Sequence, residues 1–338
     1  MDENEVPSNT SRWRIELIDK FGIRRENTDP DKILQKWRIC LLNDSEAAAI
    51  DAIVDKTYLE EFDFNSLEHI PFHINIPFKI WGIKFEPRTI GMFKTFNENL
   101  EEFRFHLYNI LRQMYMPKKR ENQGPHGIGY QVLFQKLLRC IEFRMQSQLE
   151  VPTGQINICG QEVTSKADIV GLKCDDPSKI LFICEEKSSQ VKRKCCSEGT
   201  AYSPVKKKRH PSADVEFAAE VTSSGSESLD MPSNVHAQHI GELLSYLECS
   251  VTDEGLLGMV IQKTDVMFTY LKIDPESVEK IKRRKEPGPV TFDTTKQEDP
   301  VFFYTKQFNL LRREDRRTIF KTLVTIKMME KKVCCTVL

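Results

Sequence analysis

The feature that most constrains this chain is a short apolar run that ends in charged residues. Five consecutive apolar residues, 180–184, are followed directly by Glu185, Glu186 and Lys187. A run of this kind is typical of a strand that is buried on both faces at the centre of a sheet. Because side chains alternate along a strand, Glu185 and Lys187 are expected to share one face and Glu186 to point the other way.

A second carboxylate is expected beside the first. Asp168 opens an apolar stretch, 168–172, and the segment 174–179 that separates it from the central strand contains turn-forming aspartates and a proline. An antiparallel hairpin would place Asp168 beside Glu185, with Lys187 next to both. Neighbouring buried carboxylates repel each other, and a hard divalent cation, Mg²⁺ or Mn²⁺, removes that repulsion. Such an ion activates water for attack on a phosphodiester, and Lys187 is placed to hold or deprotonate that water.

Regular elements are predicted on both sides of this hairpin. Apolar residues at helical spacing predict an amphipathic helix over 130–148, and a strand over 155–159 is expected to connect to 168–172 through a turn at Gly160. After the hairpin we expect a helix over 236–247 and strands over 256–262 and 266–273. The predicted order of helix, three strands, helix and two strands indicates a mixed α/β fold.

This order, together with Asp168 and the Glu185-Glu186-Lys187 element, resembles the PD-(D/E)XK nuclease superfamily over residues 130–273. The resemblance implies a restriction-endonuclease-like core, in which helices flank a mixed central sheet. It also implies that Asp168 and Glu185 bind the metal, that the main-chain carbonyl of Glu186 is a further ligand, and that Lys187 is catalytic. One departure is Ala167, which stands where the family name has proline.

Two helices of this fold offer further candidates. Gln238, Glu242 and Tyr246 are spaced by four and share one helix face. Some exonuclease-like branches of the family use a Gln and a Tyr on this helix, and Gln238 is the residue that we add to the catalytic site. The first helix sometimes contributes an acidic residue, and Glu142 is the only candidate there.

The remainder of the chain is predicted to surround this core. Residues 1–11 are expected to be disordered and residues 12–120 to form an N-terminal accessory region of helical and mixed structure. Within it, residues 12–61 are predicted to be helical, with a helix start at Asp29-Pro30, and the proline-punctuated residues 62–95 are predicted to be extended. Residues 188–234, which are rich in Lys, Ser and Pro, are predicted to be a disordered basic insertion. Residues 274–338 are predicted to be a C-terminal connector and tail.

Charge and composition restrict the partners. The chain has 338 residues and a net charge of -1, so a surface that binds nucleic acid or an anionic membrane must be local. No secretory signal is expected at the N-terminus, and no apolar run is long enough to span a bilayer. The 10 cysteines include no Cys-x-x-Cys pair, which favours reduced thiols in an intracellular protein.

Two short motifs bear on location. The basic clusters 192–194 and 206–209 resemble a bipartite nuclear import signal, which predicts an import receptor as a partner and the nucleus as the location. The alternative is a basic run that helps to hold a nucleic-acid backbone. The residues Cys335, Thr336, Val337 and Leu338 fit a prenylation pattern, which would instead predict a cytoplasmic or membrane-associated protein.

The sequence therefore predicts a metal-dependent nuclease that hydrolyses phosphodiester bonds in DNA or RNA. Two alternatives remain open at this point. One is a catalytically inactive, nuclease-fold protein that binds nucleic acid or regulates another factor. The other is an interaction protein anchored to a membrane through Cys335.

Overall fold

The computed structural model describes residues 6–57, 99–110 apart from positions 101, 104 and 108, 127–147, 150–187, 233–284, 290–292 and 299–336. These residues belong to one compact unit, which consists of residues 1–189 and 231–338. A second unit, residues 190–230, lies outside the described residues. The predicted insertion and its basic clusters fall there almost entirely, so disorder and the import signal stay predictions.

A mixed sheet runs through the described unit, with eight strands in the order β1-β9-β8-β7-β6-β5-β2 and with β10 paired to β8. A separate hairpin, β3-β4, lies apart from it. The strands are β1 (Arg24–Asn27), β2 (Arg144–Ser147), β3 (Gly154–Ile158), β4 (Gln161–Ser165), β5 (Ile169–Leu172), β6 (Ile180–Glu186), β7 (Gly255–Gln262), β8 (Asp265–Lys272), β9 (Val301–Tyr304) and β10 (Phe308–Asn309).

The centre of the sheet follows the prediction. β5 and β6 form an antiparallel hairpin, and β6 continues through a helical crossover to β7, which is parallel to it. The turn of the hairpin is closed by the N–H of Lys173, which donates to the carbonyl of Lys179 at 2.9 Å. Asp176 accepts hydrogen bonds from the backbone and hydroxyl of Ser178 in the same turn. The aspartates and proline thus form the reversal that their turn propensity predicts.

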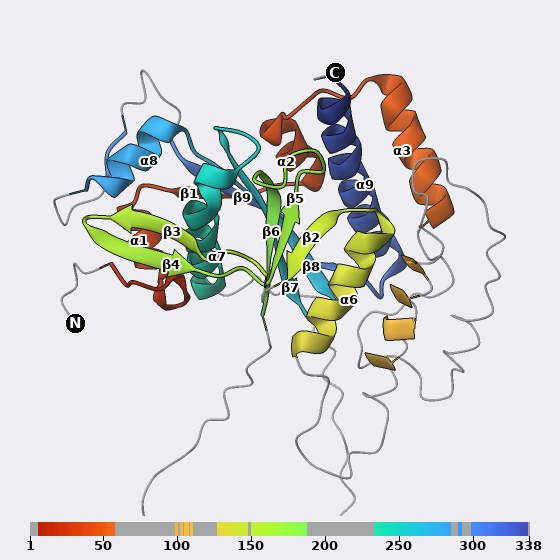
Figure 1. Cartoon of the computed structure of the whole chain (residues 1–338), viewed down its shortest axis with the longest axis horizontal. Coiled ribbons are helices and arrows are strands. Elements are labelled where there is room, and N and C mark those ends of the chain that lie inside the picture. The colour runs from red at the N-terminus through yellow and green to blue at the C-terminus, as the bar shows by residue number, and fades with distance from the viewer. Residues whose placement is uncertain are drawn as a thin grey trace, which may run out of the picture. The chain divides into compact units, whose positions relative to one another are not determined.

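Helices cover both faces of the sheet (Figure 1). One face carries α7 (Ser233–Tyr246), with α1 (Ile15–Lys20) and α8 (Pro275–Lys282) beside it. The other carries α6 (Gly127–Cys140), α2 (Pro30–Trp37) and α9 (Arg313–Thr336), and α3 (Asp44–Thr57) packs against α9. Short 3-10 turns, η1 (Thr10–Arg12) and η3 (Leu247–Cys249), complete the described elements. The protein is therefore mixed α/β, with a mixed central sheet between helical layers.

Two predicted elements differ from the structure. The helix predicted over 130–148 ends at Cys140, because Glu142 adopts a left-handed backbone conformation with φ 56° and turns the chain. Met145, which fits the helical spacing, lies in β2 opposite Gly171. The turn at Gly160 joins β3 to β4 and does not lead into β5. In both places strand pairing decided the structure, which apolar spacing alone cannot show.

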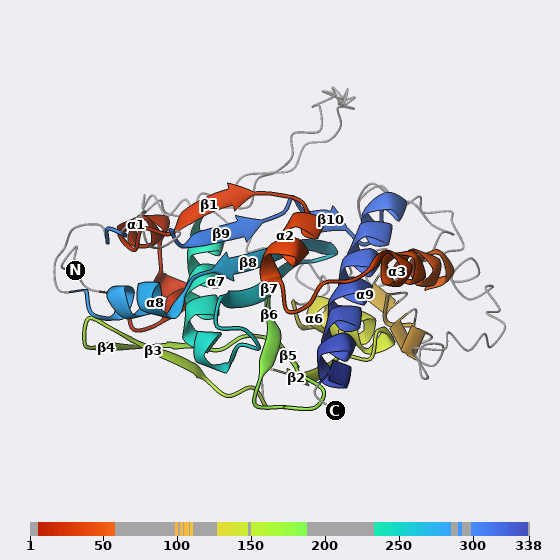
Figure 2. The same ribbon diagram turned by 90° about the horizontal axis from the view of Figure 1, so that it is seen from above.

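The N-terminal segment contributes to the same unit. Residues 6–11 fall in the range predicted to be disordered, yet they are ordered: Thr10 is buried and Ser8 pairs with Thr164 of β4. Residues 12–61 were predicted to be helical, and α2 begins at Pro30 after Asp29 as expected. However, β1 lies between two of the helices and pairs in parallel with β9, so that Arg24 is opposite Val301. Figure 2 shows these two strands side by side at one edge of the sheet. The predicted extended segments at 62–95 lie outside the described residues.

The C-terminal helix α9 is tied to the central hairpin through Cys174, which contacts both members of an ion pair buried within that helix. Lys327 and Glu330 are each 1% exposed, and Lys327 Nζ lies 2.8 Å from Glu330 Oε2. The N–H of Cys174, in the β5–β6 turn, donates to Glu330 Oε1 at 2.7 Å. Burial lowers the pKa of Lys327, but the charge of Glu330 and the contact with Cys174 outweigh this effect, so the pKa is raised overall. The segment predicted as a tail therefore packs against the core.

Among the helices that the structure describes, none has both the length and the apolar character needed to cross a bilayer. Cys335 lies in the last turn of α9, and residues 337 and 338 are outside the described part of the chain. Prenylation of Cys335 stays a prediction.

The burial of Asp265, at the start of β8, can be tested by the pH dependence of stability. Burial raises its pKa to about 6, although a 2.8 Å hydrogen bond from Asn309 Nδ2 opposes the shift. A raised folded pKa favours the protonated carboxyl, so its stabilising contribution is complete below about pH 4 and is lost as the pH rises through about 6. Asp265→Asn is expected to raise the free energy of unfolding at about pH 8 by on the order of 1 kcal/mol, with no gain near pH 4. Urea unfolding at both pH values measures this, and an equal gain in the exposed Asp253→Asn would contradict it.

Candidate active site

The ends of β5 and β6 bring the three predicted residues together. Ile169 is paired with Cys184, so the next position of the antiparallel register sets Asp168 opposite Glu185. Lys187 Nζ lies 2.7 Å from Glu185 Oε1. Asp168 Oδ2 accepts a 2.7 Å hydrogen bond from the main-chain N–H of Glu186, which fixes the carboxylate at the strand end.

The helix α7 covers this cluster and adds polar groups to it. Gln238 Nε2 donates to Glu185 Oε1 at 2.9 Å and to Glu242 Oε1 at 2.7 Å. On the far side of Glu242, its Oε2 lies 3.2 Å from His239 Nδ1, and His239 Nε2 lies 2.9 Å from Thr269 Oγ1. Gln238 thus lies where it was predicted. Glu242 was not predicted as a site residue, although its spacing of four from Gln238 was a sufficient signal.

The electrostatics of the cluster favour a cation. Glu185 is 8% exposed, and burial raises its pKa well above the usual range; Glu242 and Asp168 raise it further, while Lys187 opposes them. Burial also raises the pKa of Asp168, against the effects of the Glu186 N–H and of Lys187. Burial also raises the pKa of Glu242, to about 7. One ammonium group therefore faces three crowded carboxyl groups, and added positive charge would relieve them.

Glu186 lies on the opposite face, as strand alternation predicts. Burial and the charge of Asp168 raise its pKa to about 7, and its Oε1 is buried without a hydrogen-bond partner among the described residues. The nearby Tyr130 of α6 has a pKa of about 12, raised by burial and by the charge of Glu186. Glu186 therefore contacts the cluster through its backbone N–H, which donates to Asp168, and its side chain points away.

Two contacts hold the backbone around Asp168. The hydroxyl of Tyr246 accepts a hydrogen bond from the N–H of Ala167 at 3.2 Å and donates to the carbonyl of Pro152 at 2.9 Å. Gln131 Nε2 donates to the carbonyl of Asp168 at 2.9 Å. Proline has no N–H, so a proline at position 167 would lose the bond to Tyr246. Alanine at position 167, where the resemblance would place a proline, keeps this bond.

Glu142 does not join the cluster. It lies in the turn between α6 and β2, and its carboxylate is 3.8 Å from Lys331 Nζ of α9. Because Arg144 pairs with Leu172, this turn is at the end of β5 opposite to Asp168. Glu142 was predicted to lie on the helix over 130–148, but that helix ends at Cys140.

The donor set determines which metal the cluster fits. Within the described ranges, no group of three or more His, Cys, Asp or Glu side chains is arranged to hold a metal ion. The cluster offers Asp168, Glu185 and the main-chain carbonyl of Glu186. Mg²⁺ typically binds through one or two carboxylates and keeps several waters, whereas zinc sites use three or four protein side chains. The residues present therefore fit Mg²⁺ or Mn²⁺ better than zinc.

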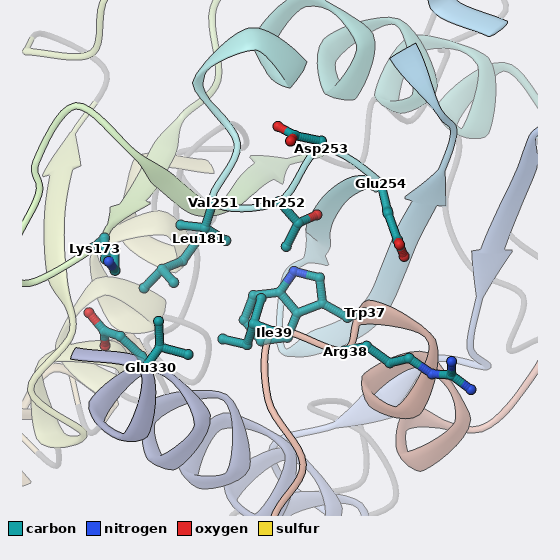
Figure 3. A pocket seen from close by; sticks show the side chains of 11 residues that line it. Trp37, Arg38, Ile39, Lys173, Leu181, Val251, Thr252, Asp253, Glu254 and Glu330 are labelled. Atoms are coloured by element: carbon teal, nitrogen blue, oxygen red, sulfur yellow. The ribbon is translucent and has the colours of Figure 1, made fainter. Parts of the chain in front are cut away.

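A cleft of about 520 Å³ lies away from the cluster (Figure 3). It is lined by residues of α2, of the segments around β6 and of α9, and it shares none of the cluster residues. The indole Nε1 of Trp37, in its wall, is buried without a hydrogen-bond partner among the described residues. Its charged lining residues carry both signs: Arg38, Lys173, Asp253, Glu254 and Glu330. This cleft is therefore not an access route to Asp168 and Glu185.

Comparisons of the chain with protein-family models, with curated proteins and with solved structures found no match. The arrangement of Asp168, Glu185, Lys187 and Gln238 is thus the basis on which a function must be argued.

Proposed function

We propose that the protein is a metal-dependent nuclease with a restriction-endonuclease-like core, which hydrolyses phosphodiester bonds in DNA or RNA. The observation that carries this proposal is the meeting of Asp168, Glu185 and Lys187 on one face at the ends of two paired central strands. This is the set of two acids and a lysine that the resemblance to the PD-(D/E)XK superfamily implies.

The connectivity around the cluster supports the fold assignment. β2, β5 and β6 pair in antiparallel fashion, α7 forms the crossover, and β7 then pairs in parallel with β6. The helix α6 precedes these strands and packs beneath them. A helix on each face of a mixed sheet is what the resemblance implies for the nuclease core.

Each residue of the cluster has a chemical task in this proposal. Asp168, Glu185 and the carbonyl of Glu186 would hold Mg²⁺ or Mn²⁺, which when bound acidifies a water molecule and polarises the phosphoryl oxygen. The ammonium group of Lys187 orients the attacking water or stabilises the charge that develops on the phosphate. Gln238 holds the Glu185 carboxylate in place through its 2.9 Å hydrogen bond.

A competing function has one observation in its favour. Glu185 Oε1 already accepts hydrogen bonds from Lys187 and Gln238, as in a closed structural ion pair. A protein that keeps the fold and binds nucleic acid without turnover would show the same contacts. The two functions differ in one respect, which is whether the cluster takes up a divalent cation.

The location stays a proposal. We keep the nucleus as the proposed location, with an import receptor bound to the clusters at 192–194 and 206–209. A membrane partner would require prenylation of Cys335.

The direct test is cleavage of labelled single-stranded and duplex DNA and RNA. Cleavage is expected with Mg²⁺ or Mn²⁺, is expected to stop when the metal is chelated, and should return when the metal is restored. Glu185→Gln is the matched control, because the amide can still accept hydrogen bonds from Lys187 and Gln238 but is a poor ligand. Cleavage that survives chelation, or that is equal in the control, would contradict the proposal. Binding without cleavage of any of the four substrates would favour the competing function.

A further inference from the structure

A groove of about 810 Å³ runs between the N-terminal segment and the start of α7. Gln238 is one of its lining residues and also contacts Glu185, so the groove adjoins the proposed catalytic cluster. Its other polar lining includes Ser8, Ser11, Arg12, Arg14 and Lys20. Access to the cluster along this groove would bring a substrate past the N-terminal segment.

The wall of the groove is fixed in place. The carbonyl of Ser8 accepts a 2.9 Å hydrogen bond from the N–H of Thr164 in β4. Trp13 is 2% exposed and packs closely on α7 at Gly241, where an added Cβ would lie 2.6 Å from Trp13 Cε3. The segment is thus anchored to the helix that carries Gln238, and contacts within the chain form the groove.

Two arginines flank the buried tryptophan. Trp13 and Arg14 both have extended backbone conformations, with φ -68° and ψ 143° for Trp13 and φ -123° and ψ 161° for Arg14. Side chains alternate along extended backbone, so Arg12 and Arg14 are both exposed while Trp13 between them is buried. Neither arginine has an ion-pair partner in the part of the chain that the structure describes.

The groove is locally basic in a chain of net charge -1. Arg12, Arg14 and Lys20 contribute positive charge, and Glu16 is the one acidic side chain among the described lining residues. Guanidinium groups present a planar fork that matches phosphate oxygens, and serine hydroxyls are further phosphate donors. The lining is therefore complementary in charge to a polyanion that carries phosphate groups.

We propose that this groove guides the sugar–phosphate backbone of a nucleic-acid strand into the catalytic cluster, with Arg12 and Arg14 on successive phosphates. The inference rests on the proposed function for the destination of the strand. Trp13 is unavailable for stacking on bases, because it is buried and its Nε1 donates to the carbonyl of Pro7 at 3.2 Å. The groove therefore contacts the backbone and binds without regard to base sequence.

Binding of a fluorescent single-stranded oligonucleotide to the full chain, with metal chelated and at several salt concentrations, tests the groove. Arg12→Gln together with Arg14→Gln is expected to weaken binding about 10-fold and to reduce the salt slope by about 1.4, since each phosphate contact contributes about 0.7. The matched control is Arg24→Gln with Arg283→Gln, which removes two exposed arginines outside the groove. The control is expected to retain the wild-type slope, and thermal unfolding checks that both variants fold.

The outcomes separate this inference from the proposed function. Arginine-dependent binding supports the groove even if the protein cleaves nothing. Metal-dependent cleavage with unchanged binding in the Arg12 and Arg14 variant would overturn the groove and leave the nuclease proposal intact. An equal loss in the control variant would also overturn it, because binding would then depend on charge anywhere on the surface. Competition by an acidic peptide as strong as that of an oligonucleotide of equal charge would identify a peptide groove and contradict the assignment.

Discussion

Asp168→Asn is expected to lower the rate of metal-dependent phosphodiester cleavage by about 10³-fold, because the cluster loses one of its two ligand carboxylates. The substitution is nearly isosteric, and the amide oxygen can still accept the hydrogen bond that the N–H of Glu186 now donates to Asp168. The fold is therefore expected to remain, and the loss should be in the cleavage rate alone. Single-turnover cleavage with saturating protein measures this.

Lys187→Met separates chemistry from metal binding in the same assay. Its ammonium group is not a metal ligand in the proposal, so cleavage should fall by a similar factor while metal binding is kept. Lys280→Met, at a lysine of α8 that pairs with Glu276, is the matched control and should cleave at the wild-type rate. Wild-type cleavage in either Asp168→Asn or Lys187→Met would contradict the assignment of the site.

The largest effect on stability is expected in α9, on the face of the sheet opposite to α7. Glu330→Ala leaves the ammonium group of Lys327 buried at 1% exposure without its carboxylate, and it also removes the acceptor for the N–H of Cys174. Loss of one partner of a buried pair typically costs about 3–5 kcal/mol. The free energy of unfolding, measured by urea denaturation, is expected to fall by this amount.

Two variants make that result specific. Glu314→Ala removes an exposed carboxylate from the first turn of the same helix and should cost about 0.5 kcal/mol. Lys327→Met combined with Glu330→Leu replaces the pair by apolar groups and should recover most of the loss, because no charge is left buried alone. A cost for Glu330→Ala no larger than for Glu314→Ala would show that α9 is not held to the core as described.

The parts of the fold that could be predicted are those with local signals. The apolar run before Glu185, the turn residues after Asp168 and the helical spacing around Gln238 each specify an element without knowledge of its neighbours. These elements are β5, β6 and α7, and they position the candidate site. The agreement is greatest where local propensity and tertiary pairing favour the same structure.

The parts that were missed depend on pairing between distant segments. The four residues of β1 are all exposed, so they carry no apolar alternation, and β1 forms by pairing in parallel with β9 far along the chain. In the site, Glu242 was visible as a helix neighbour of Gln238, but its contact with His239 and the contact of His239 with Thr269 require the packing of α7 on the sheet. The prediction that Glu142 lies on the first helix was wrong, because Glu142 itself has a left-handed backbone conformation just after the helix ends.

Calorimetric titration of Mn²⁺ into the wild type and Asp168→Asn measures whether Asp168 and Glu185 form a cation site. We expect the wild type to bind one ion, Asp168→Asn to lose that binding and Lys187→Met to retain it. Binding of equal strength in Asp168→Asn, or no binding by the wild type, would contradict the presence of this site and leave the cluster as a structural group of charges.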